Sequence, residues 1–386
     1  MKDEIQDTMT SGNSAKKRVL IIGPLPPPFG GIATVIDSII NSELSHDFSF
    51  EMFNRSESVY EPGSTSLERQ TLKIKRAWNL FKKLWSGGYD FVHLHGSTSG
   101  FLGDTLVMII AFIAGAKVLL HLHGTDWEKF YGNVSRFRRF YIRIGLFIPK
   151  RIVVLYDLWA RNIQKIDSKI DVRVIRNFVP DCPEPDEALV DGLRRRLRIE
   201  PEEFVISSIG RVGSRKGSFD IVEAATRLSL TDSNFRILLV GGQEREGEME
   251  QLQKLVSDKG MDKWVELVGE VDIQDVPLFL RLTDIFILPS YYEGMPMSII
   301  EAMRSAKPII STRVGAIPDM LESGVSGMLI NPGSPEELAN SIHTLKKDPS
   351  LRKNLSNQAR QTFQTEFETS RVVLSLRTLY QEMITS

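Results

Sequence analysis

Apolar runs of strand length alternate with amphipathic stretches along most of the chain. The runs occur at residues 18–22, 204–209, 236–240 and 284–288, and a glycine or proline follows each of them directly. Apolar residues at helical spacing follow the first run, in the stretch from Ile32 to Ile40. Because strands that alternate with helices are typical of parallel sheets, the pattern predicts an α/β chain with doubly wound sheets.

The length of the chain predicts two domains, since 386 residues exceed what one hydrophobic core usually serves. A stretch rich in proline and acidic residues begins at Pro180 and is typical of a linker. The polar N-terminal tail lacks periodicity, so we expect it to be disordered. The expected units are the tail at 1–15, an N-terminal domain at 16–180, a linker at 181–192, a C-terminal domain at 193–365 and a final helix at 366–386.

The composition, 42% hydrophobic and 25% charged, is that of an ordinary globular protein. Cys182 is the only cysteine, which excludes an internal disulfide and fits a reducing compartment. The first eighteen residues have no apolar core, so no signal peptide is readable. The most apolar stretch, residues 105–116, is too short to span a bilayer and predicts a buried helix. A cytoplasmic protein is therefore expected.

The net charge of −1 hides an asymmetry between the two halves. Residues 1–180 hold 24 Lys/Arg against 17 Asp/Glu, hence +7, and the remainder holds 24 against 32, hence −8. Two basic stretches of the first half, from Lys73 to Trp85 and from Arg136 to Arg151, interleave cations with aromatic residues. Core packing fits this pattern, and so does peripheral contact with an anionic membrane or a lipid-linked acceptor at the inner face of a membrane. Nucleic acid fits less well, because no binding motif accompanies the charge.

Two glutamates flank a predicted helix start after the run at 284–288. Pro296 suits the first helical position, which places Glu293 on the preceding loop and Glu301 inside the helix. Ionised carboxylates accept hydrogen bonds, and sugar or ribose hydroxyls offer many donors. The free N–H groups of the helix start, around Gly294 and Met295, favour an anion such as a diphosphate. Two solvated surface glutamates are the plain alternative.

Other polar residues follow strand ends. Arg211 and Lys216 lie on a glycine-broken turn, where an Arg and a Lys can clamp a diphosphate. Gly30 and Gly31 end a loop between the first strand and its helix, which is the opening of a Rossmann-like unit.

Four histidines lie on shared strand faces: His93 with His95, and His121 with His123. No Cys or Glu cluster with zinc spacing accompanies them, so we expect no metal there and no cofactor elsewhere.

The sequence EGMPMSIIEAM, with DIFILPS before it and KPIISTRVGAIPDML and GVSGMLINPGSPEELA after it, resembles the C-terminal signature of glycosyltransferase family 4. The resemblance extends from about Arg18 to about Asn340. It implies the GT-B fold, in which two Rossmann-like domains face a cleft and the final helix packs back on the N-terminal domain. It also implies transfer of a sugar from a nucleotide diphosphate donor to an acceptor hydroxyl, with retained anomeric configuration and without a metal ion.

The resemblance further implies roles for single residues. Arg211 and Lys216 would hold the donor diphosphate, Glu293 would orient sugar hydroxyls, and Glu301 would bind the ribose. His123 would contact the transferred sugar near the reacting centre. The remaining substrate-binding positions are Gly30, Gly31, Gly294, Met295 and Pro296.

The sequence departs from the family pattern at three positions. Phe178 and Ala306 stand where the family carries glycine, and Asp319 stands where it usually carries glutamate. Members of the resembled family often act in surface polysaccharide synthesis, so the resemblance also implies such a role. Two alternatives stay open: another GT-B enzyme, such as a phosphorylase or an epimerase, and a non-catalytic protein that binds nucleotides or glycans.

Overall fold

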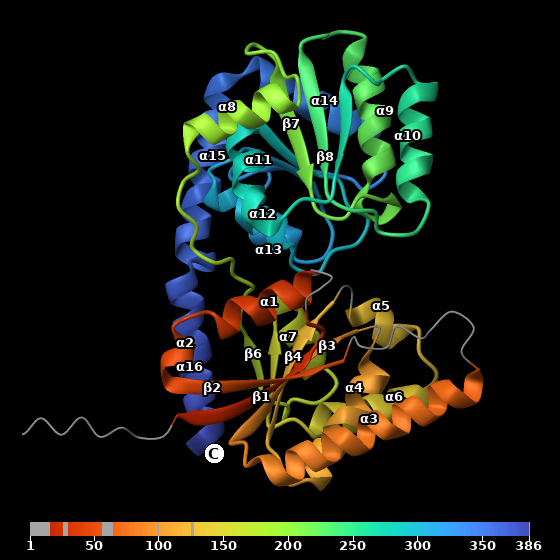
Figure 1. Cartoon of the computed structure of the whole chain (residues 1–386), viewed down its shortest axis with the longest axis vertical. Helices are drawn as coiled ribbons and strands as arrows, with labels where there is room; N and C mark the ends of the chain where they lie inside the picture. The colour runs from red at the N-terminus through yellow and green to blue at the C-terminus, as the bar shows by residue number, and fades with distance from the viewer. Residues whose placement is uncertain (1–15, 26–29, 56–64, 99, 125–126, 386) are drawn as a thin grey trace, which may run out of the picture.

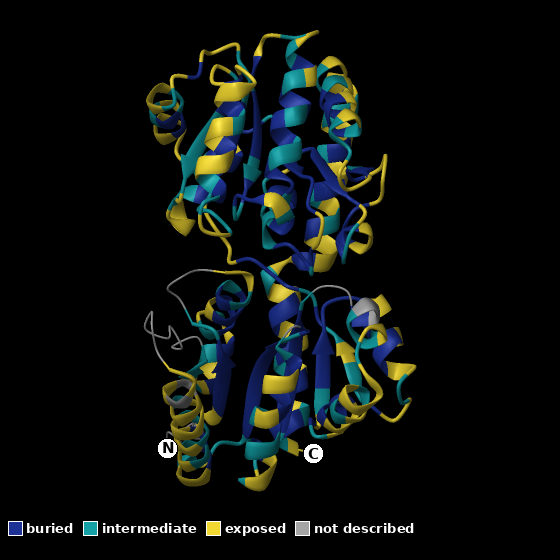
Figure 2. Ribbon diagram, turned by 90° about the vertical axis from the view of Figure 1, so that its right-hand side faces the viewer, coloured by how far each residue is buried: buried dark blue, intermediate teal, exposed yellow. Residues whose placement is uncertain are grey.

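A computed structural model of the chain describes residues 16–25, 30–55, 65–98, 100–124 and 127–385. The predicted disordered tail, 1–15, lies outside the described residues. Two six-stranded sheets form two lobes, one above the other in Figure 1, and every pairing between their strands is parallel. In each lobe the buried strands lie between helices whose outer sides are exposed (Figure 2). The predicted doubly wound α/β fold is confirmed.

The N-terminal sheet carries helices on both faces. Its strands, in spatial order, are β2 (Phe48–Asn54), β1 (Lys17–Gly23), β3 (Phe91–Ser97), β4 (Val118–His123), β5 (Arg151–Val154) and β6 (Val172–Val174). One face packs against α3 (Ser66–Gly87), α4 (Phe101–Ile113), α5 (Trp127–Gly132), α6 (Arg136–Phe147) and α7 (Asp157–Gln164). The other face packs against α1 (Gly31–Ile40), α2 (Leu44–Asp47) and the last helix of the chain.

The C-terminal sheet is built in the same way. Its strands, in spatial order, are β12 (Met328–Ile330), β11 (Ile309–Thr312), β10 (Ile285–Leu288), β7 (Phe204–Ile209), β8 (Phe235–Val240) and β9 (Val265–Gly269). One face packs against α9 (Ser218–Ser229), α10 (Glu248–Asp258) and α14 (Pro335–Lys347). The other packs against α8 (Glu187–Arg196), α11 (Val276–Leu282), α12 (Met297–Arg304) and α13 (Ile317–Met320).

The end of the chain returns to the N-terminal domain. After α15 (Pro349–Thr362) the chain continues into α16 (Thr369–Thr385), which lies beside β1 and β2 in Figure 1. Tyr380 of α16 is fully buried, and its ring makes edge contacts with Phe48 and Phe91 at centroid distances of 5.0 and 4.9 Å. The last helix thus seals the N-terminal core and ties the two lobes together.

Some local expectations from the sequence need correction. The helix α8 begins at Glu187, inside the stretch expected as linker. Pro296 is the N-cap of α12 and not its first helical residue. Ala306, which stands where the family has glycine, keeps the left-handed backbone that glycine favours, with φ of 50°. The apolar stretch that predicts a buried helix forms α4, but Phe112 and Ile113 at its end are exposed.

Candidate active site

A cleft of about 1200 Å³ lies between the two lobes, at the carboxyl ends of both parallel sheets. Strand order reverses at β1 in one sheet and at β7 in the other, and ligands of open α/β sheets bind at such switch points. Every site residue predicted from the sequence lines this cleft: Gly30, Gly31, His123, Arg211, Lys216, Glu293, Gly294, Met295, Pro296 and Glu301. The fold therefore brings together residues that are up to 271 positions apart, from Gly30 to Glu301.

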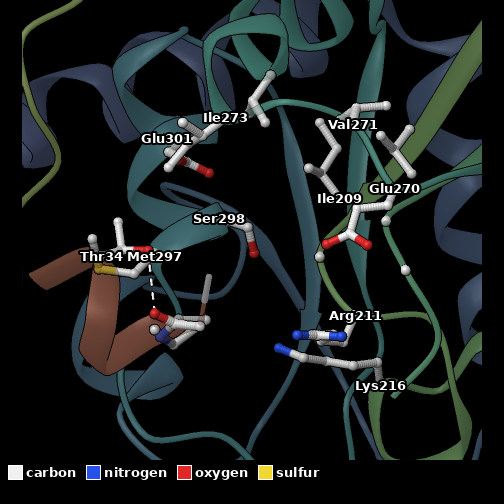
Figure 3. A pocket seen from close by; sticks show the side chains of 18 of the residues that line it. Thr34, Ile209, Arg211, Lys216, Glu270, Val271, Ile273, Met297, Ser298 and Glu301 are labelled. Carbon is white, nitrogen blue, oxygen red and sulfur yellow. Dashed lines mark hydrogen bonds between the residues drawn. The ribbon is translucent and has the colours of Figure 1, made fainter. Parts of the chain in front are cut away.

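The two predicted phosphate-binding cations come from the turn after β7. Arg211 and Lys216 lie side by side and point into the cavity (Figure 3). Gly217 follows at φ of 74°, and a Cβ there would lie 2.2 Å from the carbonyl oxygen of Pro289. Only glycine fits this close approach, which holds the turn against the end of β10. Arg211 Nη1 also donates to the carbonyl of Gln243 at 3.2 Å, which helps to orient the guanidinium.

Lys216 contacts Glu293 directly. Its Nζ donates to Glu293 Oε1 at 2.7 Å, and the Ser290 hydroxyl donates to the same oxygen at 2.7 Å. The Glu293 side chain is only 6% exposed and that of Lys216 13%, so solvent screens this ion pair weakly. From the sequence, these two residues are expected to bind separate parts of the ligand. The structure shows that one ion pair positions both at the cleft wall.

Glu301 and Ser298 point into the same cavity from α12 (Figure 3). Burial raises the pKa of the Glu301 carboxyl to about 7. Across the cavity lie Ile209 and Val271, and Ile273 lies beside Glu301; sequence reasoning did not single out these three lining residues. Ile209 ends β7, and Val271 and Ile273 follow β9, so the strand ends at the switch point were the signal that could have found them. An apolar wall opposite a carboxyl suits a nucleobase and its ribose.

The N-terminal wall is formed by the ends of β3 and β4. His123 lines the cleft, and its Nε2 lies 2.9 Å from Nδ1 of the buried His95. Burial lowers the pKa of His123 to about 3, which keeps the ring neutral at physiological pH. A neutral ring fixed through one nitrogen can form hydrogen bonds to a ligand at its free edge, but it is a weak general base.

Behind His123 the other three histidines form a buried cluster. His93 Nδ1 lies within hydrogen-bond distance of the Tyr380 hydroxyl of α16, at 2.7 Å, and the His93 ring stacks on that of His121 with a centroid distance of 5.5 Å and an interplanar angle of 4°. Nitrogens of His93, His95 and His121 lie within 4.8 Å of one another. The His95 ring is tilted by 38° to His93 and by 34° to His121. Burial lowers the pKa of all three rings, so the cluster consists of packed neutral imidazoles.

The two lobes meet at the mouth of α12. Asn177 donates its backbone N–H to the Met295 sulfur at 3.3 Å and its side-chain amide to the Met295 carbonyl at 3.0 Å. A Cβ on Gly294 would lie 2.4 Å from the carbonyl oxygen of Gly124, which follows β4. Phe178, another departure from the family pattern, is fully buried in the core under α16. The helix mouth expected to bind an anion is thus also the contact between the domains.

Two Rossmann-like domains that face such a cleft define the GT-B class of glycosyltransferase folds. Among solved structures, Anabaena Alr3699/HepE in complex with UDP and glucose aligns with a TM-score of 0.72 at 19% identity, over 95% of this chain and 100% of that one. WaaG, a glycosyltransferase involved in lipopolysaccharide biosynthesis, aligns with a TM-score of 0.67 at 15% identity, over 93% and 98%. These similarities show the shared fold.

Residues 191–362 match the family model described as glycosyl transferases group 1. The N-acetyl-alpha-D-glucosaminyl L-malate synthase of Bacillus anthracis is 25% identical over 69% of this chain and 68% of its own length. The UDP-Gal:alpha-D-GlcNAc-diphosphoundecaprenol alpha-1,3-galactosyltransferase of Escherichia coli is 25% identical over 81% and 80%. These matches identify the chain as a glycosyltransferase, and residues 191–362 are similar to glycosyl transferases of group 1.

Acid should destabilise this protein through its buried histidines. Their folded-state pKa values lie below the unfolded value near 6.5, so their contribution to stability is present above pH 6.5 and is lost as the pH falls toward about 3. His121→Leu removes one of them. Its free energy of unfolding, measured in denaturant between pH 7.5 and pH 5, should fall less steeply than that of the wild type, with a slope difference that approaches about 1.4 kcal/mol per pH unit below pH 6.5. The same slope in both proteins, or an equal change in a control with the exposed His46→Gln, would contradict the neutral cluster.

Gly294→Ala should disturb the contact between the domains and affect sugar transfer more than nucleotide binding. The new Cβ would collide with the Gly124 carbonyl, and overpacking of this kind costs about 1–3 kcal/mol. Sugar transfer should therefore fall about ten-fold or more, and nucleotide affinity, measured by calorimetry, should fall by a smaller factor, since Arg211 and Lys216 remain in place. Gly192→Ala, where no atom lies within 4 Å of the added Cβ, is the matched control and should change neither quantity. Full transfer activity in Gly294→Ala would show that this contact is dispensable.

Proposed function

We propose that this glycosyltransferase moves a sugar from a nucleoside diphosphate to a hydroxyl of a glycan or lipid-linked glycan, with retention of configuration. The observation that carries the proposal is the convergence of Arg211, Lys216, Glu293 and Glu301 with His123 in one cleft between the domains. Each matches a position that has a donor-binding or sugar-binding role in the resembled family. A location at the inner face of a membrane, where lipid-linked acceptors lie, is part of the proposal.

The cations would stabilise the leaving group. Negative charge develops on the diphosphate as the bond to the sugar breaks, so groups aimed at that charge bind the transition state better than the ground state. Arg211 offers a fork of N–H donors, and Lys216 offers a point charge held in place by Glu293. We infer that these cations and the N–H groups at the start of α12 carry this charge without a metal ion.

The remaining residues would bind and orient the sugars. Glu301 would accept hydrogen bonds from the ribose diol, and Glu293 would accept them from hydroxyls of the transferred sugar. Neutral His123 would hold the sugar at the opposite wall and leave the acceptor proton to the departing phosphate, as in front-face transfer. Closure of the lobes at the mouth of α12 would exclude water and so limit hydrolysis of the donor.

The comparisons support a uridine donor and a lipid-linked acceptor. The Escherichia coli relative is named for a UDP-galactose donor and a diphosphoundecaprenol acceptor, and the Anabaena structure holds UDP and glucose. These properties belong to those proteins, and for this chain they identify the first compounds to test.

Nucleotide binding in the presence of EDTA tests the donor site. We expect one of UDP, GDP, ADP and CMP to raise the Tm of the purified protein, because a ligand at 100 times its Kd adds about 2.7 kcal/mol of stability. Arg211→Ala should weaken that nucleotide about ten-fold or more, since a charged hydrogen bond is lost. Arg227→Ala, on the exposed side of α9, is the matched control and should behave as the wild type. No shift with any nucleotide in folded protein, or a shift only after a divalent metal is added, would overturn the proposed metal-independent site.

A further inference from the structure

The helical layer on one face of the N-terminal sheet has an apolar outer side. Ile74, Trp78, Phe81 and Trp85 of the basic stretch from Lys73 to Trp85 form an apolar stripe along α3. This stripe does not pack into the core, since Trp78 and Trp85 are 57% and 71% exposed and Ile74 is 71% exposed. The core contacts of α3 are made by Leu80 and Leu84, on a different side of the helix. The structure thereby excludes core packing, one of the two interpretations that the sequence left open for this face.

The neighbouring helices continue this outer apolar side. α3 contacts α4 and α4 contacts α6, so the three helices lie next to one another (Figure 1). On α4, Phe112 is 69% exposed, and on α6, Phe137 and Phe140 are 80% and 64% exposed. A groove of about 530 Å³ lies between α4 and α6 and is lined by five apolar side chains and Arg143. A continuous apolar surface that several neighbouring helices expose to solvent is typical of an interaction site.

The aromatic residues of α3 are fixed in place. The ring of Phe81 stacks between those of Trp78 and Trp85, with centroid distances of 5.7 Å to each, and Lys82 lies over the Trp78 ring at 5.7 Å. Large side chains that are ordered before binding lose little conformational entropy on docking. The stripe on α3 can therefore dock on an apolar surface at a low cost in side-chain entropy.

Cations surround the apolar residues. Arg136, Arg138 and Arg143 of α6 are exposed, as are Lys73 and Lys82 of α3, and residues 136–150 contain no acidic side chain. A second copy of the chain docked on this face would bring cations of the two copies together, and like charges that meet across an interface are costly. Aromatic residues interleaved with lysine and arginine fit an anionic lipid surface, where rings enter the interface and long cationic side chains reach the phosphates. The charge pattern therefore favours a bilayer over a second copy of the chain.

We propose that the outer side of α3, α4 and α6 docks this protein on an anionic bilayer and that the groove between α4 and α6 takes one hydrocarbon chain of a lipid. Arg143, at the rim of the groove, would pair with the phosphate of that lipid. Docking would bring the enzyme to a lipid-linked acceptor, and for the existence of that acceptor the inference rests on the proposed function. In the part of the chain that the structure describes, no helix has the length and apolarity to span a bilayer, so the contact is peripheral.

Flotation with lipid vesicles tests the docking surface. The wild type should bind vesicles with about a third phosphatidylglycerol at least ten times better than pure phosphatidylcholine, and about 0.5 M salt should reduce this preference. Trp78→Ser with Phe137→Ser should lower binding to the anionic vesicles ten-fold or more. Leu189→Ser with Leu230→Ser, two substitutions at exposed apolar residues of the C-terminal domain, is the matched control and should bind as the wild type does.

Two further variants separate the contribution of the cations to vesicle binding from that of the apolar groove. Arg136→Gln with Arg138→Gln should remove the preference for anionic lipid, and Ile144→Trp should fill the groove and weaken binding without a change in salt dependence. Wild-type protein that binds neither vesicle, or an equal loss in the control pair, would overturn the proposal. A second contrary outcome is dimerisation. If the wild type did not float with vesicles, formed a dimer in analytical ultracentrifugation, and lost the dimer on substitution of Trp78 and Phe137, a second copy of the chain would cover this face.

The vesicle test is independent of the donor site. Each surface variant should keep the Tm shift caused by nucleotide, since the substituted residues are on the outside of the N-terminal domain and do not line the cleft. Retained nucleotide binding without vesicle binding would reject the docking surface alone. Vesicle binding without any nucleotide binding would instead reject the proposed function and leave the surface standing.

Discussion

The ion pair between Lys216 and Glu293 is the interaction on which the candidate site depends. It joins the turn after β7 to the loop before α12 at an N–O distance of 2.7 Å, with both side chains largely shielded from water. If Glu293 were removed, Lys216 would lose its carboxylate partner in a weakly screened position, and if Lys216 were removed, Glu293 would keep only the more distant Arg215 at 3.9 Å as a cationic partner. The pair therefore couples the position of the phosphate-binding turn to that of the helix mouth, and the two parts of the donor site are held together before any ligand arrives.

The same helix mouth also sets the distance between the lobes. Met295 accepts hydrogen bonds from Asn177, and Gly294 touches the backbone after β4. On the far side, α16 carries the C-terminal end of the chain back to the N-terminal core, where Tyr380 bonds to His93. The wall of neutral histidines that ends in His123 is thus supported by a helix that belongs to the last part of the sequence.

Much of this architecture is readable from the sequence, because strand runs that end in glycine or proline mark the edges where parallel sheets bind ligands. The residues at those edges, Arg211 and Glu293 among them, could be named without a structure. Their mutual contacts could not, since Lys216 and Glu293 are 77 positions apart and tertiary contacts such as the close approach at Gly217 bring them together. The orientation of the α3 stripe was equally undecidable, because Leu80 and Leu84 give that helix a second apolar face that competes for the core.

The most direct test of the account is the anomeric configuration of the product that the purified protein makes in EDTA. The reaction would use the nucleotide sugar whose nucleotide binds and a lipid-linked or free glycan acceptor, and the coupling constant of the new linkage would be measured by NMR. The account predicts that an α-linked donor gives an α-linked product at an undiminished rate in EDTA. A β-linked product, or turnover that requires a divalent metal, would contradict the assignment of Arg211 and Lys216 as the groups that carry the leaving-group charge in a retaining transfer.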